Sequence, residues 1–343
     1  MNEKCRSDFG DIRFTKDDGE TLLDYWMEEK VDSDYAVFWI KIPSIPANST
    51  IDIYVYYGNA DAVYDGDKDS VFVNQNSGFE TGDFTDWTYE SLETGGSGDS
   101  DSVASGDAAE GSYKAYFEHD DGGVRGGPSR YQEITEKEVA IHVHDYPVSG
   151  WSGNNTRMAV ILTFYDSGGS QIGQLIYAVK YTGNYTDNDA VWDDPYDAWS
   201  EHEIHVKDDF VAKYSEADWD NVAKIKLQIG VQGGASALVK GYFDDIRVRR
   251  YVDPEPSISA IGSEEYYLQE TTIIAGEVSA EFLNGDGESL GQIYDAYDTQ
   301  FYRFRKWPQG YGSLTYRNAS SWGSSNASVS DKRMGILHAY CLK

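Results

Sequence analysis

The segments Asn76-Ser-Gly-Phe-Glu-Thr-Gly-Asp-Phe-Thr-Asp-Trp87 and Gly241-Tyr-Phe-Asp-Asp-Ile-Arg-Val248 mark the two ends of one domain. The first has the glycines of a turn and then an aromatic-rich run, which predicts a turn that leads into a strand. The second predicts a terminal strand with two adjacent carboxylates. Short runs of alternating apolar and polar residues lie between the two segments and indicate further strands.

Together these segments resemble the first and last strands of a jelly-roll β-sandwich of the carbohydrate-binding-module type. The resemblance implies a sandwich over residues 76–250 and a glycan as ligand. It also implies a structural calcium ion shared by Glu80 and an aspartate of the closing pair, Asp244 or Asp245. Calcium prefers oxygen ligands from carboxylates and carbonyl groups on loops. We therefore predict a calcium site at Asn76, Glu80, Asp244 and Asp245, with turn capping by these side chains as the alternative.

Charge and composition narrow the class of protein. The 343 residues include 59 Asp and Glu against 28 Lys and Arg, a net charge of −31. No nucleic-acid partner is expected, because phosphate groups are neutralised by clustered Lys and Arg. The acidic excess fits divalent-cation binding or a solvated surface. The 27 tyrosines and 34 glycines favour strands and turns over helices.

The N-terminal sequence predicts strands over residues 8–15, 21–28, 35–42 and 51–57. Its motifs are Asp11-Ile-Arg-Phe-Thr15, Leu23-Asp-Tyr-Trp26, Trp39-Ile-Lys-Ile-Pro-Ser-Ile-Pro-Ala-Asn-Ser-Thr50 and Ile53-Tyr-Val-Tyr-Tyr-Gly-Asn59. They resemble a family known mainly as a domain of unknown function on archaeal and bacterial surface proteins. The resemblance implies a partial β domain over residues 1–62, of the kind found beside laminin-G or lectin-like sandwiches in secreted proteins without assigned catalysis.

Members of that family normally carry further strands upstream, which are absent from this sequence. A sheet that begins at Asp8 would keep an unpaired edge, and such edges pair readily with other strands. We therefore expect non-local β pairing to complete the sheet. The added strand comes either from residues 264–343 of the same chain or from a neighbouring chain, and the second case would build a polymer.

The whole chain is predicted to be all β, a jelly-roll sandwich flanked by smaller β domains. A linker over residues 63–75 precedes the jelly-roll at 76–250. A proline-containing linker over 251–263 then leads to a β-rich segment of unknown type at 264–343. Within the jelly-roll we predict strands at residues 113–118, 138–144, 157–165, 174–181, 202–206, 223–231 and 242–248, and one helical turn at 215–221.

Aromatic residues in or near loops of the jelly-roll form the candidate carbohydrate-binding site. They are Trp151, Tyr185, Trp192 and Tyr196. Pyranose C–H faces stack on exposed aromatic rings, and neighbouring Asp and Asn side chains accept hydrogen bonds from sugar hydroxyls. The alternative is that these rings belong to the sandwich core, where aromatic side chains bury large areas.

Histidines offer a second kind of candidate site. His142 and His144 lie two residues apart, which places both side chains on one face of a strand. The spacing suits a metal, and His119, His202 and His205 lie in the same domain. No cysteine or glutamate follows at the spacing of a zinc enzyme, so we expect exposed or hydrogen-bonded histidines. Hydrolase and phosphate-binding motifs are also absent, which favours a protein that is not an enzyme.

Signals for localisation point in two directions. The chain has no visible signal peptide and no apolar run near the ~20 residues that span a bilayer. Asn-X-Ser/Thr sequons favour an exported chain, and they lie at Asn48, Asn154, Asn184, Asn318 and Asn326. The two cysteines, Cys5 and Cys341, form either a terminus-to-terminus disulfide or two unrelated thiols.

Three classes of function follow from these observations. The first is a non-enzymatic surface or adhesion protein whose calcium-stabilised jelly-roll binds a glycan. The second is a structural subunit of an extracellular filament, a surface layer or a virus particle. The third is a glycoside hydrolase or lyase, because 59 acidic residues offer many carboxylate pairs. We expect the first, at an extracellular, cell-surface or virion location.

Overall fold

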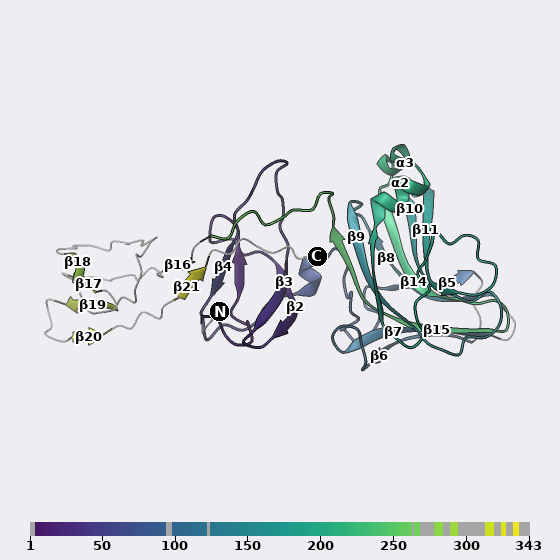
Figure 1. The fold of residues 1–343 in the computed structure, drawn as a ribbon, viewed down its shortest axis with the longest axis horizontal. Helices are drawn as coiled ribbons and strands as arrows, with labels where there is room; N and C mark the ends of the chain where they lie inside the picture. Colours follow the sequence, from purple (N-terminus) through teal and green to yellow (C-terminus); the bar gives the residue numbers. More distant parts are fainter. Residues whose placement is uncertain are drawn as a thin grey trace. The chain divides into compact units, whose positions relative to one another are not determined.

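A computed structural model describes residues 4–93, 98–121 and 124–262, together with the backbone of short strands beyond residue 263 (Figure 1). The chain divides into two compact units. Unit 1 comprises Met1–Asp67 and Pro256–Lys343, and unit 2 comprises Lys68–Glu255. The predicted sandwich therefore lies inside unit 2.

Unit 1 consists of short strands in three sheets. The N-terminal strands are β1 (Arg13–Thr15), β2 (Tyr25–Val31), β3 (Tyr35–Ile40) and β4 (Tyr54–Tyr57). The C-terminal strands are β16 (Glu264–Tyr267), β17 (Val278–Leu283), β18 (Ser289–Ile293), β19 (Ser313–Asn318), β20 (Ser324–Asn326) and β21 (Lys332–Gly335). The sheets have the orders β1-β4-β21-β16, β2-β3 and β18-β17-β19-β20. Each predicted N-terminal strand is confirmed; β1, β3 and β4 are shorter than predicted, and β2 is shifted to end at Val31.

A strand from the C-terminal segment extends the first sheet of unit 1. β21 pairs antiparallel with β4, with Met334 opposite Tyr56, and β16 pairs with β21. The intramolecular one of the two expected pairings is therefore present on the β4 side of the sheet, whereas β1 remains an edge strand. Strand addition between chains stays a prediction.

The core of unit 1 follows the period-2 pattern of its strands. Ile53 and Val55 are buried together with Phe14, Leu23 and Tyr25. The phenyl ring of Phe14 packs edge to face on the ring of Tyr25, with 5.3 Å between centroids. This cluster is small, and it is separate from the core of unit 2.

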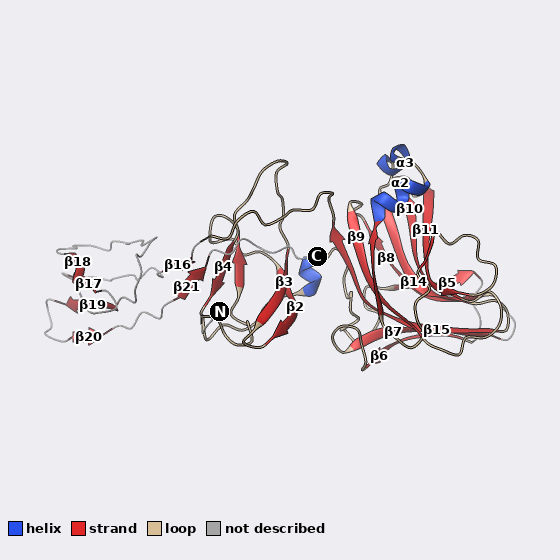
Figure 2. Ribbon diagram, viewed as in Figure 1, coloured by secondary structure: helices blue, strands red, loops and turns tan. Residues whose placement is uncertain are grey.

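Unit 2 is a sandwich of two mainly antiparallel sheets, and its helices are short (Figure 2). One sheet has the order β12-β11-β10-β14-β8-β5, and the other has the order β13-β9-β15-β7-β6. The strands are β5 (Thr88–Glu93), β6 (Asp99–Ser105), β7 (Tyr113–Asp121), β8 (Gly126–Ile134), β9 (Val139–Pro147), β10 (Arg157–Tyr165), β11 (Gln171–Tyr181), β12 (Ala190–Val191), β13 (Ser200–His205), β14 (Lys224–Gln232) and β15 (Ala237–Arg250). The helices are α1 (Lys68–Val71), α2 (Val206–Lys213) and α3 (Glu216–Asp220). The predicted all-β jelly-roll is confirmed.

The core lies between the two sheets and explains the patterns of the central strands. β10 is buried along almost its whole length, because it lies between β11 and β14 and both of its faces are covered. β9 alternates instead: Val139, Ile141 and Val143 face the core, whereas His142 and His144 lie on the opposite face. The sheet that contains β9 therefore buries one face in the core, and its other face, which we call the open face, carries half-buried side chains such as His142 and His144.

Several elements differ from the prediction. β6, β8 and β12 were not predicted, because β6 is mostly polar, β8 is interrupted by glycine and proline, and β12 has two residues. The strand predicted for the opening segment is β5, which begins directly after Trp87. The strand predicted at residues 202–206 ends at His205, and α2 follows directly and buries Val206 and Phe210, one helical turn apart. The predicted helical turn is α3, whose N-cap Ser215 accepts a hydrogen bond from the backbone N–H of Asp218.

Candidate functional site

The closing strand β15 changes register at its two carboxylates. Asp244 lies opposite His144 of β9, and the next paired residue is Arg247, opposite His142. Asp245, inside this bulge, has a φ of 47°, a left-handed conformation that Asp adopts more readily than most residues. Asp244 and Asp245 are both buried, with 0% and 2% exposure. Buried carboxylates require hydrogen-bond or ion-pair partners, and the bulge places both carboxylates within reach of such partners.

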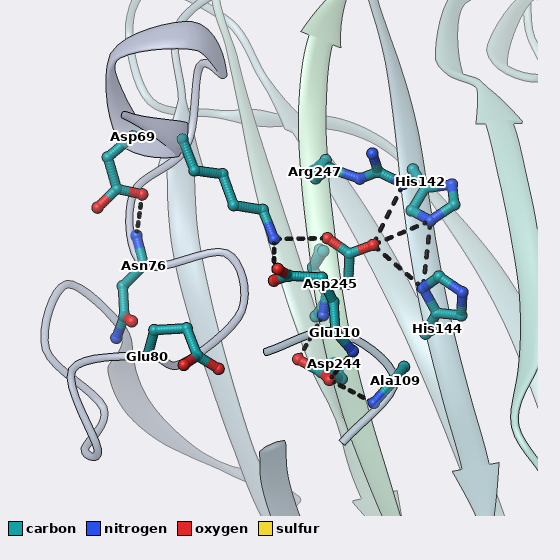
Figure 3. Close-up of polar contacts among 12 residues, drawn as sticks. Asp69, Asn76, Glu80, Ala109, Glu110, His142, His144, Asp244, Asp245 and Arg247 are labelled. Carbon is teal, nitrogen blue, oxygen red and sulfur yellow. Dashed lines mark hydrogen bonds and ion pairs between the residues drawn. The ribbon is translucent and has the colours of Figure 1, made fainter. Parts of the chain in front are cut away.

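Asp245 is the centre of a buried ion cluster (Figure 3). Its Oδ1 atom lies 2.7 Å from Nζ of Lys68. Its Oδ2 atom lies 3.2 Å from the guanidinium of Arg247, and 3.4 and 3.3 Å from ring nitrogens of His142 and His144. The two imidazoles also contact each other, with 3.2 Å between Nε2 of His142 and Nδ1 of His144. The spacing of the two histidines thus places both on one carboxylate.

These partners keep Asp245 charged. Burial by itself raises the pKa of Asp245, because the carboxylate loses its hydration. The hydrogen bonds from His142 and His144 and the charges of Lys68 and Arg247 together outweigh this effect, and they hold the pKa of Asp245 well below its usual value. Burial also lowers the pKa of His142, which favours the neutral imidazole at pH 7.

The opening turn is organised by Asn76 and Glu80, two of the predicted calcium ligands. The Nδ2 atom of Asn76 donates to the backbone carbonyls of Asp83 and Thr85, at 3.2 and 2.9 Å. The Oε1 atom of Glu80 accepts hydrogen bonds from the backbone N–H groups of Ser112 and the residue after it, at 2.8 and 2.9 Å. In the structure these two side chains therefore act as turn caps, the alternative interpretation of this pair.

Asp244, the third predicted ligand, also bonds to backbone. Its Oδ2 atom accepts from the N–H groups of Ala109 and Glu110, at 2.8 and 3.0 Å, and its Oδ1 atom accepts from that of Asp245 at 2.7 Å. Burial raises the pKa of Asp244 to about 7, although these hydrogen bonds act in the opposite direction. The closing strand is thereby joined to the loop before β7.

Lys68 places an ammonium group where the calcium ion is predicted. Its Nζ atom lies 2.8 Å from Glu110 as well as 2.7 Å from Asp245. Gly78 leaves room for this convergence: a Cβ atom there would lie 3.3 Å from Nζ of Lys68 and 3.7 Å from Cγ of Glu80. The calcium ion stays a prediction, and it would have to compete with the ammonium group.

The candidate carbohydrate-binding aromatics lie in three local settings. Trp192 stacks on the imidazole of His202, with 3.8 Å between centroids and an interplanar angle of 8°. Trp151 packs edge to face on Tyr196, at 5.5 Å, and Tyr196 is 38% exposed. Tyr185 is half-buried and donates its hydroxyl to a backbone carbonyl. Trp151 and Trp192 also pack against the main core, and sugar binding by these four residues stays a prediction.

A second set of aromatic rings crosses the open face of the five-stranded sheet, and the sequence did not identify it as a group. Tyr116 of β7 lies opposite Tyr242 of β15, and Tyr242 lies opposite Tyr146 of β9. Trp199, immediately before β13, continues the series beside Tyr146. The centroid distances along the series are 5.0, 5.8 and 5.3 Å. We call these four half-buried residues the aromatic row.

The alternation of the strands explains why the aromatic row faces outward. Phe117 and Phe243, the chain neighbours of Tyr116 and Tyr242, are fully buried between the sheets. The ammonium group of Lys114 lies 4.3 Å from the centroid of Tyr242, a cation–π contact that supports the row from one side. The sequence predicts that Tyr116 and Tyr242 face away from their buried neighbours, but it does not predict which strands lie side by side.

Other predicted residues have simpler surroundings. His119 is fully buried and lies 2.6 Å from Asp99, and the His205 side chain is 40% exposed, so both are hydrogen-bonded or exposed as expected. The sequon asparagines Asn48, Asn154 and Asn184 are exposed. The side chains of Asn318 and Asn326, and all of Cys341, lie outside the described residues. The disulfide and the glycosylation therefore stay predictions.

Comparison with solved structures finds β-sandwich modules. TmCBM61 in complex with beta-1,4-galactotriose is 18% identical, with a TM-score of 0.31 over 52% of this chain and 99% of that one. A carbohydrate-binding module of the β-sandwich superfamily is 12% identical, with a TM-score of 0.35 over 68% and 85%. The enzymatically active domain of bacteriophage CBA120 tailspike protein 4 is 11% identical, with a TM-score of 0.34 over 55% and 23%. These likenesses concern the fold.

No curated protein matches the chain. Within the part of the chain that the structure describes, no helix has the length and apolar character needed to cross a membrane. A family model described as a domain of unknown function, DUF2341, matches residues 8–90. The N-terminal part of the chain is therefore similar to that family, as its motifs indicate.

Proposed function

We propose that unit 2 is a non-enzymatic glycan-binding module and that the aromatic row is its binding surface. The observation that carries the proposal is the alignment of Trp199, Tyr146, Tyr242 and Tyr116 across adjacent strands of one sheet. The C–H faces of pyranoses stack on aromatic rings, so a line of rings suits consecutive sugars of one chain. Tyrosine and tryptophan also dominate binding energy at interfaces in general.

Polar groups flank the aromatic row and can bind sugar hydroxyls. On one side Lys240 of β15 lies opposite Glu118 of β7, and the hydroxyl of Tyr116 donates to Glu118. On the other side Glu201 lies opposite His144. This combination of stacking rings and flanking charged groups supports an oligosaccharide as the ligand.

The two carboxylates of the closing strand, Asp244 and Asp245, support binding rather than catalysis. A glycosidase requires one carboxyl group as a proton donor and a second as a base or nucleophile beside the sugar bond. Asp244 is occupied by backbone N–H groups, and Asp245 by Lys68, Arg247 and two imidazoles. Both side chains are therefore occupied by structural contacts.

We also propose that the protein acts at a cell surface, as an adhesion protein. Exposed sequon asparagines and a module with an open glycan-binding face both fit an exported chain. A structural subunit of a filament, surface layer or virus particle would use the same face as an interface between chains. The binding experiment below separates these two functions, because only the first requires a sugar ligand.

Alanine at Tyr242 or at Trp199 is expected to weaken glycan binding by at least about tenfold, because each substitution removes one stacking platform. A glycan array identifies the ligand, and isothermal titration calorimetry then measures the dissociation constants. Tyr89→Ala is the matched control: it removes a tyrosine that is 47% exposed on β5, in the other sheet, and should leave binding unchanged. Unchanged affinity in both row variants would rule out the row, and loss in Trp151→Ala or Tyr196→Ala alone would move the site to the loops.

For the structural cation, we propose that calcium binds at Glu80 and the closing carboxylates only in competition with Lys68. Lys68→Gln removes the ammonium group and is expected to raise calcium affinity at least about tenfold over the unaltered chain. Glu80→Gln in the same background should reverse the gain. Calorimetry with calcium chloride measures both effects. Equal affinity with and without Lys68, or no binding in either protein, would contradict the proposal.

A further inference from the structure

Three side chains with metal-binding groups meet at one edge of unit 2. They are Asp145 of β9, Asp194, which follows β12, and His202 of β13. β12 and β13 are edge strands, each of its own sheet. The group is distinct from the ion cluster around Asp245 and from the aromatic row.

The distances within this group are short. The Nε2 atom of His202 lies 2.9 Å from Oδ2 of Asp194 and 3.5 Å from Oδ2 of Asp145. One ligand atom from each residue lies within 4.8 Å of the other two. In a tetrahedral shell with bonds of about 2.0–2.2 Å, neighbouring ligand atoms are about 3.3–3.6 Å apart. The 3.5 Å distance falls in this range, whereas the 2.9 Å distance is that of a hydrogen bond, so a cation would replace the proton between His202 and Asp194 and widen that contact by about 0.5 Å.

Asp145 gives an independent reason to expect a cation. Its side chain is 0% exposed, and neither carboxylate oxygen has a hydrogen-bond partner. It occupies an inward position of β9, in the alternation of Val139, Ile141 and Val143, where the side chain faces the sandwich interior. A buried carboxylate without a donor is strongly disfavoured, since it loses hydration without compensation.

The surrounding structure holds the other two groups in place. The backbone N–H of Asp194 donates to the carbonyl of Val179 at 3.1 Å, which fixes the residue beside β11. The imidazole of His202 lies flat against the indole of Trp192, 3.8 Å between centroids, so its Nε2 atom is held toward the carboxylates. Trp192 is anchored in turn by a 2.9 Å hydrogen bond from its backbone N–H to Ala178. Such support is typical of preorganised metal ligands.

We propose that Asp145, Asp194 and His202 bind a divalent cation, and that the ion is zinc. An imidazole nitrogen with carboxylate oxygens is a ligand set that zinc accepts, whereas calcium takes oxygen ligands. The His202 side chain is 21% exposed, so water can approach the site from the side of this residue and supply the fourth ligand. The cation would neutralise the two facing carboxylates and join the edges of the two sheets.

The experiment uses the full chain, freed of metal by a chelator and then dialysed. Zinc chloride is added, binding is measured by competition with a chromophoric chelator, and the melting temperature is followed by circular dichroism. One zinc ion per unit 2 and a higher melting temperature are expected, since a ligand of the native state stabilises it. Asp194→Asn and His202→Gln should each weaken binding at least about tenfold. Cobalt(II) should give visible absorption bands that both variants lose.

His144→Gln is the matched control, because it changes a histidine of the same sheet that contacts Asp245 instead. It should retain zinc affinity and the cobalt spectrum. The His202 side chain is 21% exposed and that of Asp194 is 10% exposed, so His202→Gln is the milder change, and it keeps the test open if Asp194→Asn fails to fold. The proposal is overturned if zinc neither binds nor raises the melting temperature. It is also overturned if binding survives in Asp194→Asn or is lost in His144→Gln alone.

Discussion

Replacement of Asp245 with asparagine is expected to lower the free energy of unfolding of unit 2 by about 3–5 kcal/mol, the usual loss when one partner of a buried ion pair is removed. The side chain of Asp245 is only 3% exposed, so solvent screens its interactions little. Asparagine keeps the size of the side chain but removes the charge that faces Lys68 and Arg247. These cations then remain beside a neutral group in a poorly hydrated site.

Urea denaturation at pH 7, followed by circular dichroism, measures this loss. Glu133→Gln is the matched control, because Glu133 pairs with Lys224 at the surface, where the side chains are 51% and 33% exposed. Exposed pairs contribute about 0–1 kcal/mol, so this variant should be nearly as stable as the unaltered chain. Equal, small losses in both variants would show that the Asp245 cluster does not hold the closing strand.

The same substitution is expected to change the response to acid. The pKa of Asp245 is held below its usual 3.8 in the folded state, so its contribution to stability is complete above that value. It is lost as the pH falls from 3.8 toward the lower folded-state pKa. The unaltered chain should therefore lose more stability in that interval than the Asp245→Asn variant does.

The strands of unit 2 were predictable where their own sequences carry the pattern. β10 is apolar along most of its length, and β14 and β9 alternate polar and apolar residues, so propensity and burial agree there. β8 begins Gly126-Gly-Pro and shows no such pattern, yet it pairs with β14 and β5. The pairing with β14 and β5 imposes its strand conformation, and nothing in the sequence of β8 itself predicts that pairing.

The candidate site was predictable only in part, for a related reason. The adjacent acids Asp244 and Asp245 stand out in the sequence, but their main cation, Lys68, lies 177 residues away from Asp245 in a stretch that reads as a linker. Asp145 gave a signal that can be read in retrospect. Counting by twos from Val139 places this acid at an inward position, and an acid there requires a partner.

Substitution of Phe79 by alanine is expected to destabilise unit 2 by about 3–5 kcal/mol, as for other fully buried aromatic residues. Phe79 is 0% exposed, and its ring packs against Trp87 and Phe84, with centroids 5.4 and 5.9 Å away. All three belong to the opening segment. Tyr89→Ala, at a position 47% exposed, should change stability by less than about 1 kcal/mol and serves as the control.

The backbone of Phe79 makes a sharper version of this test possible. Its φ of 57° lies in the left-handed region, which costs a residue with a side chain about 1–2 kcal/mol but costs glycine little. The burial of the ring outweighs that strain in the native chain. The alanine variant loses the buried ring but keeps the strained left-handed backbone, whereas the glycine variant loses the ring and is also free of the strain. Phe79→Gly should therefore be no less stable than Phe79→Ala in urea denaturation, although glycine is normally the more destabilising residue. A clearly less stable glycine variant would show that the turn is not strained at Phe79, and that the segment is held by the packing of its rings alone.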